Sequence, residues 1–351
     1  MDKIMEKKWK NRDKDACDRI SLSADPSTRH TISSVPAQTD RFRTPQPFSV
    51  SEKTSVQKTD PGRYLRQGQK FGNYVILKRL SPTQSNPAFL ITPENNTLLP
   101  ENPDTAVLKL YPAPDDPEKF LSVMKKLKDL STSQNESTKI TPEILSSGID
   151  ENGYCWYISR YVELPSLESF IQAKAPLKEH KALYTIYTIA ALLNKNCATW
   201  GPHGRLTPSK ILFGLKKQPL FPGMGLNSFL QQNKEKMLPD EKLFYASPEY
   251  ISDGTVSQLS DIYSLGIIFF RLLSGVLPFY SPDVRKLKEE HLTGIMPSLS
   301  GKNPAVHVSS PTVGIINRMT MKDPARRFSS MEKLLEALIQ ADDALPPEEK
   351  D

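Results

Sequence analysis

Acidic residues are missing from one long stretch of this 351-residue chain. No aspartate or glutamate occurs in residues 180–234, although 40 acidic residues in the whole sequence would place about six in a stretch of that length. The same stretch keeps seven basic residues, which are Lys181, Lys195, Arg205, Lys210, Lys216, Lys217 and Lys234. It therefore cannot supply a carboxylate to a metal ion or to a proton-transfer reaction.

Cysteine is scarce and long apolar runs are absent. The three cysteines are odd in number and far apart, which suggests neither a disulfide framework nor a cysteine metal cluster. The charged N-terminus lacks the apolar core of a signal peptide, and no stretch approaches the roughly 20 apolar residues of a membrane helix. The net charge of +6 is not gathered into a basic stripe with interleaved aromatics. We expect a soluble cytoplasmic protein with no membrane or nucleic-acid partner.

The composition divides the chain into a tail and one folded body. Residues 20–60 contain 18 Ser, Thr or Pro residues and show no period of 2 or 3.6, so they cannot bury enough apolar surface to offset the entropy of ordering. We predict a disordered Ser/Thr/Pro-rich tail over residues 1–66, a folded domain over residues 67–342 and a disordered C-terminus over residues 343–351.

Strand patterns fill the first part of the folded domain, and helical patterns fill the rest. Branched and aromatic residues between Pro, Asn or Gly predict strands at Tyr74–Leu80, Ala88–Thr92, Ala106–Tyr111, Ile144–Ile149 and Cys155–Val162. Helical periodicity predicts one helix that begins near Asp116 and a second, separate helix that ends near Thr199. It also predicts helices over Ile262–Leu273 and over residues 284–292, 311–320 and 329–341. Five strands with one helix, followed by a mostly helical part, predict a two-lobed α+β fold.

Five short sequence motifs occur one after another along the domain. They are Thr105-Ala-Val-Leu-Lys109, residues His203 to Leu212, Ala246-Ser-Pro-Glu249, Ser260-Asp-Ile-Tyr-Ser-Leu-Gly266 and residues Lys322 to Phe328. In this order and spacing they resemble the protein kinase superfamily, in particular bacterial-type Ser/Thr kinases. The resemblance implies a protein-kinase-like fold with a small β-rich N-lobe with one main helix, about residues 67–162, and a larger helical C-lobe, about residues 163–342.

Residues with structural roles in that family are retained. The resemblance implies that Glu249 pairs with Arg327 and that Asp261 accepts backbone N–H bonds from the loop beginning at His203. His203 itself is expected to pack beneath the loop as a structural histidine. Local sequence leaves a second interpretation of Asp261, as the N-cap of the apolar helix that follows it.

Residues with chemical roles in the family are replaced. Phosphoryl transfer needs a carboxylate that accepts the hydroxyl proton, and an Asp and an Asn that hold magnesium. By the resemblance, Arg205 stands at the proton acceptor, Thr207 at the loop lysine and Lys210 at the metal-binding asparagine. The metal-binding aspartate falls in residues 220–226, where our alignment places Gly223 and a one-residue slip stays open. Arginine cannot accept the proton, and an ammonium group cannot coordinate Mg²⁺.

The nucleotide-binding positions are altered as well. The glycine-rich loop corresponds to residues 81–86, with Ser81, Thr83 and Asn86 where glycines are expected. Val123 stands where the glutamate partner of Lys109 belongs. Lys109 is a candidate contact for a nucleotide or another anion, and the plain alternative is a strand lysine whose stem lies on apolar neighbours. Arg205 and Lys210 likewise either hold a phosphate or acidic peptide or are solvated loop cations.

Two functions remain open. The first is a catalytically inactive kinase-like domain, a pseudokinase that acts as a scaffold or allosteric regulator of a protein partner such as an active kinase or signalling protein. The alternative is an atypical or residually active ATP-dependent Ser/Thr kinase, for which the retained Lys109 is the main argument. For the first we expect no cofactor and no magnesium, with at most weak, metal-independent ATP binding. The sequence leaves the partner and the oligomeric state unknown.

Overall fold

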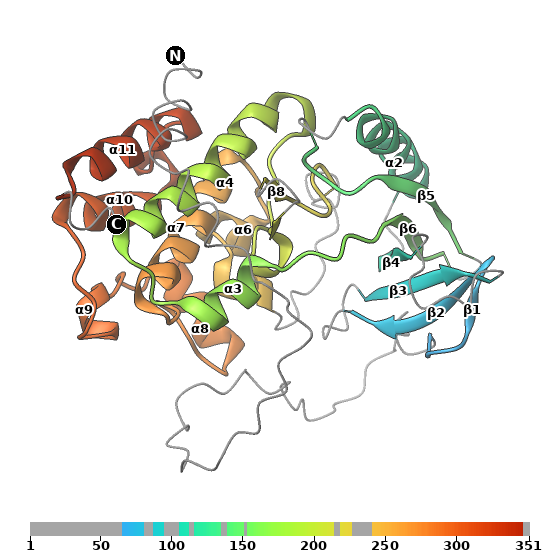
Figure 1. Cartoon of the computed structure of the whole chain (residues 1–351), viewed down its shortest axis with the longest axis horizontal. Helices are drawn as coiled ribbons and strands as arrows, with labels where there is room; N and C mark the ends of the chain where they lie inside the picture. The colour runs from blue at the N-terminus through green and yellow to red at the C-terminus, as the bar shows by residue number, and fades with distance from the viewer. Residues whose placement is uncertain are drawn as a thin grey trace, which may run out of the picture. The chain divides into compact units, whose positions relative to one another are not determined.

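The computed structural model describes residues 65–80, 87–94, 105–111, 116–134, 139–150, 153–213, 218–226 and 241–346 (Figure 1). All of them belong to the contact unit Lys53–Asp351. Most of the predicted tail and C-terminus lies outside the described residues, so both predicted boundaries stay predictions. The last described helix runs to Ala344.

One antiparallel sheet forms the first lobe. Its six strands are β1 (Lys70–Phe71), β2 (Tyr74–Arg79), β3 (Ala88–Pro93), β4 (Ala106–Tyr111), β5 (Ile144–Ile149) and β6 (Cys155–Arg160). They lie in the order β1-β2-β3-β4-β6-β5, and Lys109 of β4 faces Tyr157 of β6 in the register. The five longer strands match the predicted ones. β1 was not predicted, because two residues carry no alternation that a sequence pattern could reveal.

Helix α2 (Pro117–Thr132) covers this sheet and starts where the sequence predicts. The Asp116 carboxylate caps it by accepting the backbone N–H of Lys119 at 2.9 Å, and Pro117 opens its first turn. Phe120, Met124 and Leu127 are buried, and Val123 and Leu130 are half-buried. The fourth buried position is Ser131, whose hydroxyl accepts the backbone N–H of Ile144 at the start of β5.

The second lobe is helical. Its helices are α3 (Leu167–Lys174), α4 (Glu179–Trp200), α6 (Pro248–Asp253), α7 (Gln258–Ser274), α8 (Val284–Leu292), α9 (Leu299–Lys302), α10 (Ser310–Met319) and α11 (Met331–Ala344), and a short pair of strands, β7 (Leu212–Phe213) and β8 (Pro219–Leu220), follows α4. Helix α7 is buried along nearly its whole length and packs against α4 and α10 (Figure 1). The predicted two-lobed α+β arrangement is therefore present. Three short helices, α3, α6 and α9, were not predicted.

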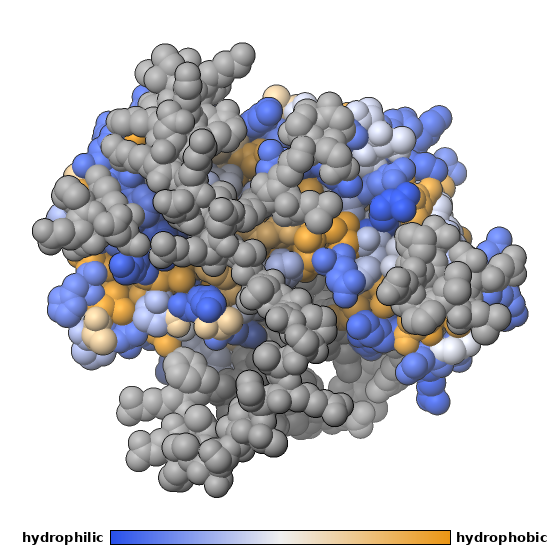
Figure 2. Space-filling model, viewed as in Figure 1, coloured by the Kyte–Doolittle hydropathy of each residue, from blue (hydrophilic) through white to orange (hydrophobic). Residues whose placement is uncertain are grey.

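The surface is mixed in character. On the face seen in Figure 2, hydrophilic residues cover much of the described surface, with apolar residues in smaller areas between them. Among the described residues, none of the helices combines the length and the apolar character that crossing a membrane requires.

Two helical glycines provide a test of how closely α7 and α10 approach. A methyl group at Gly266 of α7 would stand 2.7 Å from Thr320 Cγ2 and 2.9 Å from Met319 Cβ. We predict that Gly266→Ala lowers the free energy of unfolding by about 1 to 3 kcal/mol, because the extra methyl overpacks the contact. Urea-induced unfolding followed by circular dichroism measures the change.

Gly314 of α10 is the matched control. It is exposed and helical, and a methyl group there meets nothing within 4 Å. Gly314→Ala should raise the free energy of unfolding by about 0.5 to 1 kcal/mol, because alanine restricts the unfolded chain more than glycine does. A stability loss at Gly314→Ala equal to that at Gly266→Ala would contradict the close approach.

Candidate functional site

The loop at residues 201–211 connects α4 to β7, and Asp261 holds its start. One Asp261 carboxylate oxygen accepts the backbone N–H of His203 and the other accepts that of Gly204, both at 2.7 Å. Burial raises the pKa of Asp261 to about 7, and the two N–H donors act in the opposite direction. The predicted contact between Asp261 and the loop is thus present.

The same geometry decides the second interpretation of Asp261. The N-cap of α7 is Ser257, whose hydroxyl accepts the backbone N–H groups of Leu259 and Ser260. Ser260 returns a contact to the Ser257 backbone N–H, which completes a capping box. Asp261 lies inside the first turn, so the interpretation of Asp261 as the N-cap is wrong.

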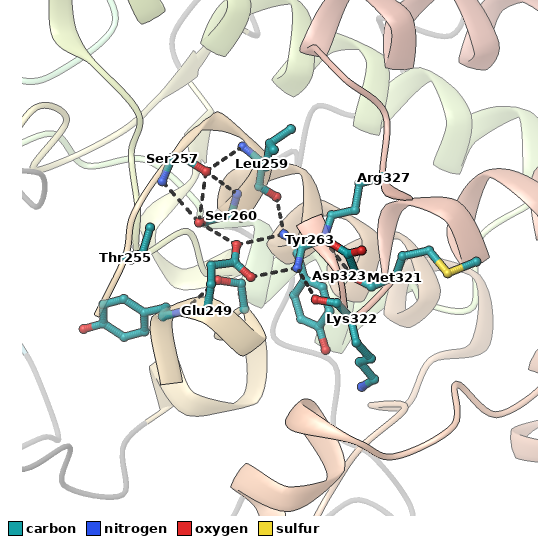
Figure 3. A network of polar contacts seen from close by, with 12 residues as sticks. Glu249, Thr255, Ser257, Leu259, Ser260, Tyr263, Met321, Lys322, Asp323 and Arg327 are labelled. Atoms are coloured by element: carbon teal, nitrogen blue, oxygen red, sulfur yellow. Dashed lines mark hydrogen bonds and ion pairs between the residues drawn. The ribbon is translucent and has the colours of Figure 1, made fainter. Parts of the chain in front are cut away.

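Glu249 and Arg327 form a buried bidentate ion pair (Figure 3). The guanidinium donates to both carboxylate oxygens at 2.8 and 2.7 Å, and it also donates to the backbone carbonyl of Leu259. The hydroxyl of Ser260 donates to Glu249 at 2.8 Å. Burial raises the pKa of Glu249, but the hydrogen bonds and charge of Arg327 outweigh it and hold the pKa below its ordinary value. The predicted pair therefore ties α6 to the segment before α11.

His203 is buried beneath the loop, as expected of a structural histidine. Its Nδ1 accepts the backbone N–H of Arg205 at 3.4 Å, and its ring lies edge-on to Phe221. Burial, and then the positive charges of Lys210, Lys109 and Arg205, lower the pKa of His203 well below its ordinary value. The imidazole is therefore neutral near pH 7, and its environment is cationic.

The three replaced loop residues differ in their surroundings. The Arg205 guanidinium lies over the Tyr250 ring at 5.6 Å, and its Nε is buried without a hydrogen bond among the described residues. Thr207 is buried and shares a hydrogen bond with Ser209. The Lys210 ammonium donates to the Arg205 backbone carbonyl at 3.2 Å. Lys210 is half-buried, and this contact ties its ammonium to the loop.

Gly223 faces Lys109 where the resemblance expects an aspartate. Gly223 adopts φ of +90°, a region that favours glycine, and a Cβ built on it would stand 4.0 Å from the Lys109 ammonium and 3.7 Å from the Tyr157 hydroxyl. The Lys109 ammonium lies 5.5 Å from the Tyr157 ring centroid. No ion pair of Lys109 with a carboxylate occurs within the described part of the chain, and Val123 of α2 supplies none. This position supports our alignment of Gly223.

A small pocket adjoins Gly223. It lies between α2 and the turn at residues 222–226, and its lining includes Met124, Leu127, Ile144 and Tyr157. Gly225 allows α2 to approach this turn, because a Cβ on it would stand 2.8 Å from Leu127 Cδ2. The two lobes are thus in contact next to Gly223, where α2 meets this turn.

Several sequence-based assignments cannot be placed. Ser81, Thr83 and Asn86 lie outside the described residues, as do Glu235 and Asp240, which are the nearest acidic residues after the acid-free stretch. Within the described ranges, no three His, Cys, Asp or Glu side chains come together in a way that could hold a metal ion. Two contacts were missed from the sequence: Ser260 with Glu249, and Tyr250 with Arg205. Each joins residues far apart in the chain, and no local signal marks them.

Comparison with known proteins agrees with the geometry. A sequence model of the protein kinase domain matches residues 145–339, more than half of the chain. That match excludes Lys109 and residues 81–86. The serine/threonine-protein kinase PrkC of Bacillus subtilis is 29% identical over 56% of this chain and 30% of its own length.

Two further relatives extend this pattern. The probable serine/threonine-protein kinase PknB of Lactococcus lactis is 25% identical over 51% of this chain and 29% of its own length. The serine/threonine-protein kinase pkn3 of Myxococcus xanthus is 25% identical over 57% of this chain and 38% of its own length. The chain thus spans well under half the length of these three curated relatives.

The Glu249–Arg327 pair predicts a specific pH dependence. Glu249→Gln should lower the free energy of unfolding at pH 7 by about 3 kcal/mol or more, because it leaves the Arg327 charge buried without its partner. Since the folded-state pKa of Glu249 lies below its ordinary value of 4.5, the pair stabilises the fold above that value and loses its effect as the pH falls through the folded-state pKa. The gap between wild type and variant should therefore narrow below about pH 4.5 in urea titrations at several pH values.

Glu336→Gln is the control for this experiment. Glu336 pairs with Lys333 at 2.9 Å, but both side chains are exposed, so its loss should change stability little at any pH. A Glu249→Gln deficit that stays constant or widens on acidification would show that the buried pair is not the cause.

Proposed function

This chain belongs to the protein kinase domain family, and we propose that it is a pseudokinase, which keeps the kinase scaffold without transferring phosphate. The observation that carries the proposal is the pair of exchanges around the loop. By the family resemblance, a cation, Arg205, stands at the proton acceptor, and Gly223 stands at the metal-binding aspartate, where a Cβ would lie 4.0 Å from the Lys109 ammonium. Both exchanges remove a carboxylate from a position where the reaction needs one.

Electrostatics supports inactivity. Phosphoryl transfer depends on positioned metal ions that neutralise the phosphates and on a base that receives the hydroxyl proton. The described loop instead presents Arg205 and Lys210, whose charges already lower the pKa of His203. A positive charge at each position repels a magnesium ion. Because single key groups commonly contribute about 10²-fold or more to rate, several losses together leave no useful transfer.

The retained contacts support a role in binding. Asp261 and the Glu249–Arg327 pair hold the loop and α6 in the helical lobe. These contacts keep a rigid surface without supplying any reacting group. We propose that the domain acts as a scaffold or allosteric regulator of a protein partner, for which an active kinase is the leading class.

One observation favours the competing function. The relatives named above are serine/threonine kinases, and Lys109 is retained on β4 with its ammonium directed toward Gly223. A residually active kinase would use Lys109 to hold the nucleotide. It would also need magnesium ligands, and the two positions at which the family resemblance expects them hold Lys210 and Gly223.

A phosphoryl-transfer assay separates the two functions. We predict that the full chain, given radiolabelled ATP with Mg²⁺ or Mn²⁺ and a generic protein substrate, transfers no more phosphate than Lys109→Ala does. The reason is that neither the base nor the metal ligands are present at their positions. Autophosphorylation is read from the same gels.

An active bacterial serine/threonine kinase serves as the positive control for this assay. Metal-dependent transfer by the wild type that disappears in Lys109→Ala would sink the pseudokinase proposal and establish the residual kinase. Equal background in both proteins supports the proposal.

A further inference from the structure

The sheet of the first lobe ends, among the described strands, in an uncharged strand. β5 stands last in the order of that sheet and pairs with β6, whereas β1 at the opposite edge has only two residues. An edge strand presents unpaired backbone N–H and C=O groups, and natural proteins usually guard them with lysine, with proline or by keeping the strand short. The six residues of β5, Ile144-Leu-Ser-Ser-Gly-Ile149, include neither a charged residue nor a proline. β5 therefore has the character of an edge that accepts another strand.

The acidic residues on either side of β5 are engaged elsewhere. The Glu143 carboxylate pairs with Arg160 of β6 at 3.2 Å. The Asp150 carboxylate accepts the backbone N–H of Tyr154 at 2.8 Å, within the turn that joins β5 to β6. Both side chains thus support the hairpin, and neither places an unpaired charge beside the edge.

The first part of β5 is closed to a new strand. A bulge lies between Ile144 and Ser146, which interrupts the regular ladder. The backbone N–H of Ile144 donates to the Ser131 hydroxyl of α2 at 2.9 Å. The open part of the edge therefore begins after Ser146.

The backbone direction of the remaining residues follows from the end of the hairpin. The backbone N–H of Asp150 donates to the Tyr154 carbonyl. Backbone groups alternate in direction along an antiparallel strand, so those of Gly148 also point to β6. Those of Ser147 and Ile149 point away from it. Two residues thus offer N–H and C=O groups to an incoming strand.

An aromatic surface lies beside these groups. Gly148 faces Trp156 of β6 in the register, and a Cβ on Gly148 would stand 2.6 Å from the indole, so the ring lies across the glycine. The indole is half-buried and meets the Phe71 ring edge-on at 5.4 Å. Because Gly148 has no side chain, a strand added beside β5 brings the side chain opposite Gly148 to the indole. This position favours a large apolar residue.

Positive charge lies next to the start of β5. The C-terminal half of α2 packs there, and it carries three exposed lysines, Lys125, Lys126 and Lys128, against one acidic residue, Asp129. A partner with acidic residues beside its strand complements this charge, which speeds association and disfavours basic partners.

From these observations we propose that the outer edge of β5 binds an extended acidic segment of a protein partner, which adds a strand to the sheet. The segment carries a large apolar residue opposite Gly148, and its acidic residues lie toward the lysines of α2. The inference rests on the proposed function, because it assigns a surface by which the domain holds its partner. Backbone hydrogen bonds at Ser147 and Ile149 provide the binding, and Trp156 and the lysines provide the selectivity.

Amide exchange tests the geometry of the edge in the full chain. We expect the Ser147 and Ile149 amides to exchange rapidly with deuterium and the Gly148 amide to exchange slowly, because only the Gly148 amide points to β6. Hydrogen exchange followed by NMR at single residues measures the three rates. Slow exchange at all three would show that the edge is already covered, and would overturn the proposal.

Binding is tested with random linear peptides displayed on phage and selected on the full chain. We expect selected peptides that alternate in the manner of a strand and contain acidic residues and a large apolar residue. Ser147→Pro should weaken their binding by about tenfold or more, because it removes one backbone donor at the edge. Proline is tolerated on an edge strand where the missing N–H faces away from the ladder. Ser147→Ala keeps the N–H and is the matched control, with unchanged affinity.

Ile149→Lys is the second variant, in case the proline disturbs the fold. The Ile149 side chain is exposed, so lysine there should leave the melting temperature unchanged while it guards the edge and weakens binding. Lys286→Gln, on an exposed position of α8, should leave binding unchanged, whereas Lys125→Gln should weaken it several-fold.

Three results would overturn the strand-binding edge. They are a selection that yields no binding peptide, peptides indifferent to both Ser147→Pro and Ile149→Lys, and a dimer of this chain in sedimentation that Ser147→Pro abolishes. The last result would identify a second copy as the occupant. The phosphoryl-transfer assay tests the pseudokinase function separately. Absence of both transfer and peptide binding would remove only the β5 edge, whereas metal-dependent transfer would remove the proposed function itself.

Discussion

The rest of the helical lobe depends on the buried first turn of α7. Within a few residues, this turn binds the loop after α4 through Asp261. It also binds Glu249 through Ser260, and the Leu259 carbonyl accepts a hydrogen bond from Arg327 (Figure 3). Two otherwise separate segments are thereby fixed to one helix that is itself enclosed by the core. Buried charges of this kind are stable only when they are fully paired. The contacts therefore support one another, because loss of one leaves a buried group without its partner.

Acidic residues are kept where they hold the fold together, and basic residues or glycine occupy the candidate site. Where a carboxylate holds backbone N–H groups or a buried arginine, it is kept, as Asp261 and Glu249 are. Where the family resemblance expects a carboxylate that faces a nucleotide or a metal ion, the chain has Arg205 or Gly223 instead, and Lys210 takes the place of the expected asparagine. The acid-free residues 180–234 reflect this division, because they include the loop and the turn but end before the segment that carries Glu249.

Sequence patterns located the elements that are long and periodic, and they missed those that tertiary packing creates. Five strands and α2 follow from alternation, periodicity and the Asp116 cap, whereas β1 and α9 are too short to show either pattern. The sequence left open that Asp261 is the N-cap of α7. The N-cap is Ser257, and Ser257 and Ser260 carry the spacing of a capping box. Motif order assigns Lys109 and Gly223 to positions of the kinase family, but only the fold brings the Lys109 ammonium of one lobe next to Gly223 in the other, where a Cβ would lie 4.0 Å from it.

Lys210 contributes a contact that holds the loop in shape. A metal-binding asparagine serves both the metal and the loop in an active kinase, so its loss should leave the loop less well held. Here the Lys210 ammonium donates to the Arg205 carbonyl and supplies a contact within the loop itself. Arg205 in turn lies on Tyr250 of α6, which places its charge against the helix that Glu249 anchors. The exchanged residues are therefore integrated into the scaffold, and the loss of carboxylates and the preservation of the fold are two aspects of one arrangement.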